Sequence, residues 1–104
     1  MTDYSKVPVH YMLSGMQRYV EHGIEPGSFL RAVLENDLHQ AVAYADSENM
    51  KALWEWCMFI YTDIPASIWG SPEKVQAHID ACAQLREYDA ALKRETEAKE
   101  SGHV

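Results

Sequence analysis

Three sets of residues in this 104-residue chain have types and spacings that could support chemistry. His78 and Cys82 are four positions apart, so a helix would place both on one face, as metal ligands sometimes lie. Zinc usually takes four ligands in closely spaced pairs, and the other four histidines are scattered without forming a second pair. We therefore expect no metal and no cofactor.

The other two sets are Cys57 and the carboxylate pair Glu35 and Asp37. Cys57 lies between Trp56 and Met58, and apolar surroundings disfavour the thiolate that a nucleophile requires. Residues two apart on a helix do not face each other, so Glu35 and Asp37 do not form an acid/base pair there. We predict that the protein is not an enzyme, and keep a small enzyme as a less favoured alternative.

The charge distribution separates the possible partners. The net charge is −7, and the section from residue 21 to residue 63 holds eight acids and two bases, a net charge of −6. Nucleic acid requires Lys and Arg to neutralise phosphates, and the one short segment that resembles a recognition helix, residues 37–45, has neither. The sequence favours a protein partner with a basic surface over direct nucleic-acid binding. The alternative is that the acids serve solubility alone.

Length and composition indicate one globular domain. Apolar residues make up 47% of the chain and charged residues 24%, which is typical of a folded protein. The longest apolar run, residues 56–61, is far shorter than a membrane span, and the N-terminus lacks the order of a signal peptide. We expect one helical domain over residues 1–100, a disordered tail over 101–104, a cytoplasmic location and no membrane contact.

Breakers and caps divide the chain into about five helices. The expected helices run from Pro8 to Gly23, from residues 26–28 to Leu34, from Leu38 to Ala45, from Asp46-Ser47 to Asp63, and from Pro72 to the polar segment 93–100. Asn36-Asp37 marks an interruption or an N-cap, because short polar side chains can accept exposed backbone amides, and the alternative is one continuous, bent helix. No segment alternates as a strand would, so we predict an all-α, irregular bundle with a long C-terminal helix.

The fourth expected helix is apolar nearly all round, which is typical of a helix that is central or partly covered by a partner. We expect it at the centre of the bundle. Its spacing predicts an inward stripe, with Trp56, Met58 and Phe59 off that stripe. The predicted stripe consists of Met50, Leu53, Trp54, Cys57, Ile60 and Tyr61. Trp69, in the loop before Pro72, is either a surface anchor or a side chain folded back on the core.

The candidate binding residues combine acids with aromatic anchors. A partner with a basic surface would meet the carboxylates, and an aromatic side chain would supply apolar contact. The candidates are Glu25, Glu35, Asn36, Asp37, Tyr44, Asp46, Glu48 and Trp69.

Four short runs carry a resemblance to a known group of proteins: residues 18–24 (RYVEHGI), 26–30 (PGSFL), 32–38 (AVLENDL) and 69–73 (WGSPE). In this order and spacing they resemble a family of small proteins encoded by phages and prophages. The resemblance covers about 60 residues, from Tyr19 to Ile79. It implies a viral accessory protein in the cytoplasm of a bacterial host, and it supplies no catalytic residues.

Together these observations predict a non-enzymatic phage accessory protein that binds and modulates a host protein. The expected action is inhibition of a host defence or nucleic-acid-processing complex through the acidic, aromatic-containing surface. The alternative is a structural module that self-associates, as a homodimer, through the apolar fourth helix or the long last helix.

Overall fold

Six α-helices and three short 3-10 segments make up the described part of the chain. The computed structural model describes the backbone of residues 2–101 and the side chains of residues 2–97. No strand occurs within these bounds, which confirms the all-α fold. The elements are η1 Tyr4–Lys6, η2 His10–Met12, α1 Leu13–His22, α2 Ser28–Leu34, α3 Leu38–Tyr44, α4 Ser47–Lys51, α5 Leu53–Asp63, η3 Ala66–Ile68 and α6 Pro72–Ser101.

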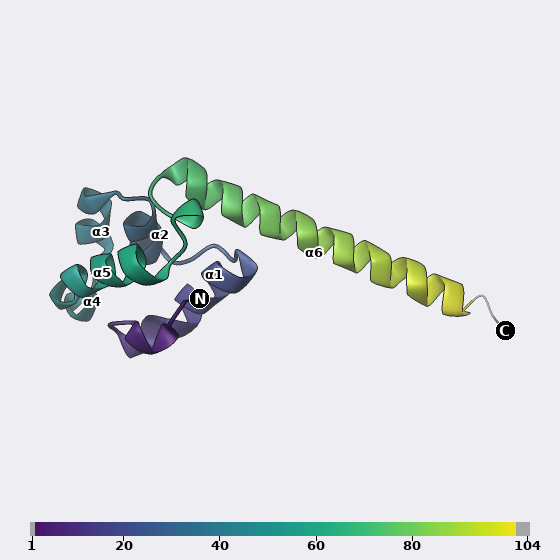
Figure 1. Cartoon of the computed structure of the whole chain (residues 1–104), viewed down its shortest axis with the longest axis horizontal. Helices are drawn as coiled ribbons and strands as arrows, with labels where there is room; N and C mark the ends of the chain where they lie inside the picture. Colours follow the sequence, from purple (N-terminus) through teal and green to yellow (C-terminus); the bar gives the residue numbers. More distant parts are fainter. Residues whose placement is uncertain (1, 102–104) are drawn as a thin grey trace.

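The helices form a head and an arm (Figure 1). Helices α1 to α5 cluster together, and we call residues 2–71 the head. Helix α6 begins against the head and then extends away from it, which gives the molecule its dimensions of 62 × 26 × 24 Å. At a rise of 1.5 Å per residue, the 30 residues of α6 span about 45 Å. We call residues 87–101, its outer part, the arm.

Several expected boundaries are confirmed, and others are corrected. Gly23 ends α1, and α6 begins at Pro72 with Ser71 Oγ accepting the backbone N–H of Lys74 at 3.2 Å. The expected fourth helix is two helices, because the backbone at Ala52 leaves the helical region between α4 and α5. Pro8 and Val9 lie outside any helix, the 3-10 segment η2 follows them, and α1 begins only at Leu13, later than expected. Ser101 belongs to α6, and the rest of the predicted tail lies outside the described residues.

The junction between α2 and α3 is a helix end followed directly by a helix cap. Asn36 is left-handed, with φ of 64°, and the backbone N–H of Asp37 donates to the carbonyl of Ala32 at 2.9 Å, which closes the last turn of α2. The Asp37 carboxylate then accepts the backbone N–H of Gln40 at 3.1 Å as the N-cap of α3. Helices α2 and α3 are therefore two separate helices.

The core centres on Trp56 of α5. Its ring has edge-to-face contacts with Phe29 and Phe59, at centroid distances of 6.0 and 6.2 Å. The indole N–H of Trp56 donates to Oδ1 of the buried Asn49 at 3.0 Å, so its one polar atom is satisfied away from water. Phe59 and Ile60 are buried beside it.

The predicted inward stripe of this segment is therefore largely wrong. Trp56 and Phe59, placed off the stripe, are buried, while Met50, Trp54, Cys57 and Tyr61 are exposed. The physical reason is that nearly every position from residue 53 to residue 61 is apolar, so the spacing does not distinguish one face from another. The buried Asn49, which can pair with an indole N–H, selects the face that carries Trp56.

Helix α6 is fixed to the head by α1. His78 Nε2 donates to the carbonyl of Tyr19 at 2.7 Å, and the two rings meet edge to face with centroids 4.9 Å apart. The fully buried Tyr19 donates its own hydroxyl to the carbonyl of Ile68 at 2.5 Å. One turn further along, Gly23 lies directly against Cys82. These contacts set the direction in which α6 leaves the head.

We expect Gly23→Ala to destabilise the protein by about 2 kcal/mol or more, because a left-handed alanine and an overpacked contact both cost free energy. Residue 23 has φ of +61°, and a Cβ there would lie 2.4 Å from Cβ of Cys82 and 3.1 Å from the carbonyl oxygen of His78. Urea unfolding followed by circular dichroism measures the change. The matched control is Gly15→Ala in α1. Its Cβ would lie 3.6 Å from Cδ1 of Leu30 in α2, and we expect it to stabilise the protein by up to about 1 kcal/mol. Equal stability of the two variants would contradict the packing described for Gly23.

Stability should also fall at alkaline pH as Tyr19 ionises. Burial raises the pKa of Tyr19 to about 12, against about 10 for an unfolded tyrosine. Between these values the folded state holds the proton and the unfolded state does not, so stability falls as the pH rises from about 10 to about 12. Unfolding free energies from urea titrations over this range measure the slope. Tyr19→Phe, which removes this proton, should show a shallower decline than the wild-type protein, and an unchanged decline would contradict the assignment.

Candidate functional site

The outward face of α5 carries a ridge of large apolar side chains. Trp54, Met58 and Tyr61 follow the i, i+4, i+7 spacing of one helix face and are 70%, 41% and 72% exposed. Scattered exposed apolar residues are ordinary on protein surfaces, but a contiguous set of this size on one helix face is typical of an interaction site.

An apolar groove lies beside this ridge. It encloses about 440 Å³, and its lining includes Val33 from α2, Met58 and Tyr61 from α5, and Trp69 from the loop before α6. A recess of about 50 Å³ adjoins it, shares Val33, Asn36 and Cys57 with it, and extends to Leu38 of α3. We call the ridge and both hollows together the α5 groove. Its apolar walls can hold an apolar side chain or helix face.

Trp69 is positioned as one wall of the α5 groove. Its indole N–H donates to the carbonyl of Ile64 at 3.1 Å, and its ring meets Tyr61 edge to face at a centroid distance of 6.2 Å. The backbone N–H of Gly70 donates to the carbonyl of Leu34 at 2.7 Å and ties the loop to the end of α2. Trp69 is half-buried, so it is folded back toward the core and still contributes to the groove.

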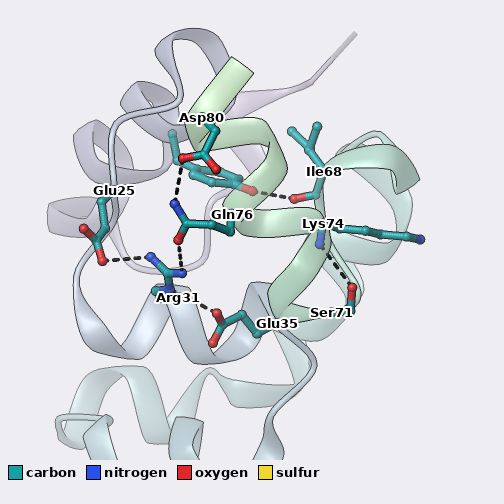
Figure 2. Close-up of polar contacts among 9 residues, drawn as sticks. Glu25, Arg31, Glu35, Ile68, Ser71, Lys74, Gln76 and Asp80 are labelled. Carbon is teal, nitrogen blue, oxygen red and sulfur yellow. Dashed lines mark hydrogen bonds and ion pairs between the residues drawn. The ribbon is translucent and has the colours of Figure 1, made fainter. Parts of the chain in front are cut away.

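Glu25 and Glu35, two of the candidate acids, are engaged by Arg31 (Figure 2). Arg31 donates to Glu25 at 2.8 Å, to Glu35 at 3.0 Å and to Oε1 of Gln76 of α6 at 2.8 Å. Burial lowers the pKa of Arg31, but the hydrogen bonds and charges of Glu35 and Glu25 together outweigh it and raise that pKa above its usual value. Gln76 in turn donates to Asp80 at 2.9 Å, so the network joins α2 to α6.

Asp37 and Asp46, two further candidate acids, cap helices. Asp37 caps α3, and Asp46 accepts the backbone N–H of Asn49 at 2.8 Å as the N-cap of α4. The Tyr11 hydroxyl also donates to Asp46. That hydrogen bond raises the pKa of Tyr11 to about 12 and, with the Asn49 N–H, holds the pKa of Asp46 below its usual value. These carboxylates stabilise the helix starts.

The eight candidate residues do not form one surface. Glu35, Asp37 and Tyr44 line a separate polar groove of about 410 Å³ between α2 and α3, together with Arg31. Asn36 and Trp69 line the α5 groove instead, and Asp37 borders its recess as well as the polar groove. The remaining candidates lie elsewhere: Glu25 is exposed beside Arg31, Asp46 begins α4, and Glu48 is exposed near Lys51 with a 3.8 Å ion pair.

The residues weighed for metal chemistry have structural contacts. His78 Nδ1 is 3.8 Å from Cys82 Sγ, while its other ring nitrogen holds the Tyr19 carbonyl. Both cysteines are free thiols. No group of three or more potential metal ligands gathers in the described part of the chain. Among the same residues, no helix combines the length and the apolar character needed to cross a membrane.

Comparison of the chain with protein-family models, curated proteins and solved structures finds no match in any of the three. The resemblance to a phage-encoded family stays a prediction.

Trp54, Met58 and Tyr61 are the residues of this site that sequence reasoning did not select. Two of them were assigned to the core stripe, and Met58 was placed off that stripe without a role. One signal was present: a helix apolar all round either lies wholly inside a fold or meets a partner. A head of this size cannot surround α5 completely, because a small domain has too little chain to bury every apolar residue.

We expect Arg31→Met to destabilise the protein by about 2 kcal/mol, because charge-assisted hydrogen bonds are lost and the partly buried Glu35 keeps its charge without a cation. The Arg31 and Glu35 side chains are 23% and 17% exposed. Lys51→Met is the matched control, since the Glu48–Lys51 pair is solvent-exposed and its loss should change stability by less than about 0.5 kcal/mol. Urea unfolding of both variants measures the difference, and equal effects would contradict the role of Arg31.

Proposed function

We propose that this protein is a non-enzymatic binding module whose α5 groove holds an apolar segment, flanked by basic residues, of a host protein. Binding there modulates that protein, and inhibition is the expected outcome. The observation that carries the proposal is the exposed ridge of Trp54, Met58 and Tyr61 beside the groove of about 440 Å³. Tryptophan and tyrosine are the residues that most often supply the binding energy of protein interfaces.

The shape of the site favours a helix or a short apolar segment as its occupant. The ridge follows one face of an 11-residue helix, and the groove runs beside it between α5, α2 and the Trp69 loop. An amphipathic helix can insert its i, i+3, i+4 side chains into such a groove. Trp69, held by its hydrogen bond to Ile64, provides a wall that does not have to become ordered on binding.

The charge of the head favours basic residues around that apolar segment. Residues 21–63, which contain α2 to α5, carry a net charge of −6. Asp37 lines the recess of the groove, and Glu55 is exposed on α5, where it borders a separate hollow with Lys6 and Val9. Complementary charge speeds association and rejects acidic competitors, although it adds little affinity for exposed pairs. The phage-family resemblance supports a partner from the bacterial host and a location in its cytoplasm.

The test is affinity capture from a bacterial lysate, followed by titration of the purified partner. Met58→Glu introduces a charge into the apolar wall of the groove, so we expect the dissociation constant for that partner to rise at least about tenfold. Gln17→Glu adds the same charge on the exposed face of α1, away from the groove, and should leave binding unchanged. Circular dichroism of both variants verifies that the fold is kept.

Salt and charge reversal test the electrostatic part separately. Glu55→Lys and raised ionic strength should each slow association of the partner measured by surface plasmon resonance. A partner whose binding survives Met58→Glu would overturn the groove assignment. A partner that binds tightly without any response to salt or to Glu55→Lys would overturn its proposed basic character.

A further inference from the structure

One side of α6 carries an apolar stripe that begins before the arm, continues into it and is left exposed by the head. Leu85, Tyr88 and Leu92 are 64%, 63% and 44% exposed, and the exposed Ala81 precedes them by one turn. The spacings of four, three and four residues are those of the a and d positions of a coiled coil. Figure 1 shows this part of α6 extending away from the other helices.

The head does not account for the length of this helix. Val75 and Ile79 pack against the core, and Arg86 donates to the carbonyl of His22 at the end of α1. The arm begins at the next residue. Isolated helices of about 12–15 residues are marginal in water, since most helical stability in proteins comes from packing an apolar face. A partner that covers the stripe would supply that packing.

The near-neutral charge of this segment lets it pair with a second copy of the chain. Residues 85–97 hold three bases and four acids, a net charge of −1, whereas residues 21–63 carry −6. Two α5 grooves would therefore repel each other, but two arms would not. None of the four stripe positions, Ala81, Leu85, Tyr88 and Leu92, is charged.

The order of residues along the stripe favours an antiparallel pair. If Leu85 of one copy lies opposite Tyr88 of the other, Ala81 lies opposite Leu92, and each of these layers occurs twice by symmetry. Arg86 and Asp89 share one flank of the stripe, since they are three residues apart. An antiparallel pair brings the same flanks together, so Asp89 of each copy lies near Arg86 of the other, whose guanidinium also donates to the carbonyl of its own His22. A parallel pair would instead place Asp89 beside the flank of Gln84 and Ala91.

We propose that the protein forms an antiparallel homodimer through the α6 stripe of Ala81, Leu85, Tyr88 and Leu92. This inference goes beyond the proposed function, because it uses a different surface and a different partner. The stripe spans only four layers, so the dimer dissociates on dilution.

Sedimentation equilibrium over a wide concentration series tests the dimer with the full-length chain. We expect a reversible monomer–dimer equilibrium whose dissociation constant rises at least about tenfold in Leu92→Glu, because each dimer loses two buried leucines. Ala90→Glu is the matched control: it adds the same charge to an exposed position off the stripe and should leave the equilibrium unchanged. Met58→Glu should also leave it unchanged, so failure of this proposal is distinguished from failure of the groove proposal.

A distance measurement tests the orientation. A spin label on Thr96→Cys, with Cys57→Ser and Cys82→Ala removing the native thiols, reports the separation between the two copies. Residue 96 of one helix lies opposite residue 77 of the other in the proposed register, so the labels should be displaced by about 28 Å along the axis. Labels in direct proximity would overturn the antiparallel register. The proposed interface would be overturned if the protein is a monomer at every concentration, or if Leu92→Glu leaves the dissociation constant of the dimer unchanged.

Discussion

The close contact between α1 and α6 is the constraint on which the arrangement of the molecule depends. Gly23 ends α1 with a left-handed residue, and because it has no Cβ the chain can lie directly against Cys82. Tyr19, one turn earlier, is held by His78 of α6 and by the carbonyl of Ile68. Tyr19 thereby fixes α6 through its backbone carbonyl and ring, and the segment before α6 through its hydroxyl. Since Trp69 follows Ile68, this contact also helps to position the wall of the α5 groove.

The features that could be predicted from the sequence are those set by a few neighbouring residues. The end of α1 at Gly23, the cap of α3 by Asp37 and the start of α6 at Pro72 each depend on one turn of chain, and the structure confirms them. The orientation of α5 could not be predicted, because its apolar residues surround the whole helix. It depends on Asn49 satisfying the Trp56 indole, a buried pairing that hydrophobic periodicity does not encode.

The candidate site likewise has a part that could be predicted from the sequence and a part that could not. An acidic surface could be predicted from charge, but the spacing did not reveal that Arg31 would engage Glu25 and Glu35 while reaching Gln76, which is 45 residues away. Carboxylates that cap helices or pair with a half-buried guanidinium are held in place by the fold, so they are less free to meet a partner. Trp54 and Tyr61 neither cap a helix nor neutralise a charge. Large aromatic side chains bury much apolar surface, so covering them with a partner is strongly favourable.

The two proposed surfaces also differ in what their association requires. The α5 groove is built on the packed head, and its walls are ordered before a partner arrives, so little conformational entropy is lost on binding. The arm depends on its own partner for part of its helical stability, so its ordering and its pairing are coupled. An antiparallel pair of arms would place the two heads at opposite ends of a shared helical rod. Each dimer would then present two α5 grooves, and a target with two binding segments would be held by both at an effective concentration set by the rod.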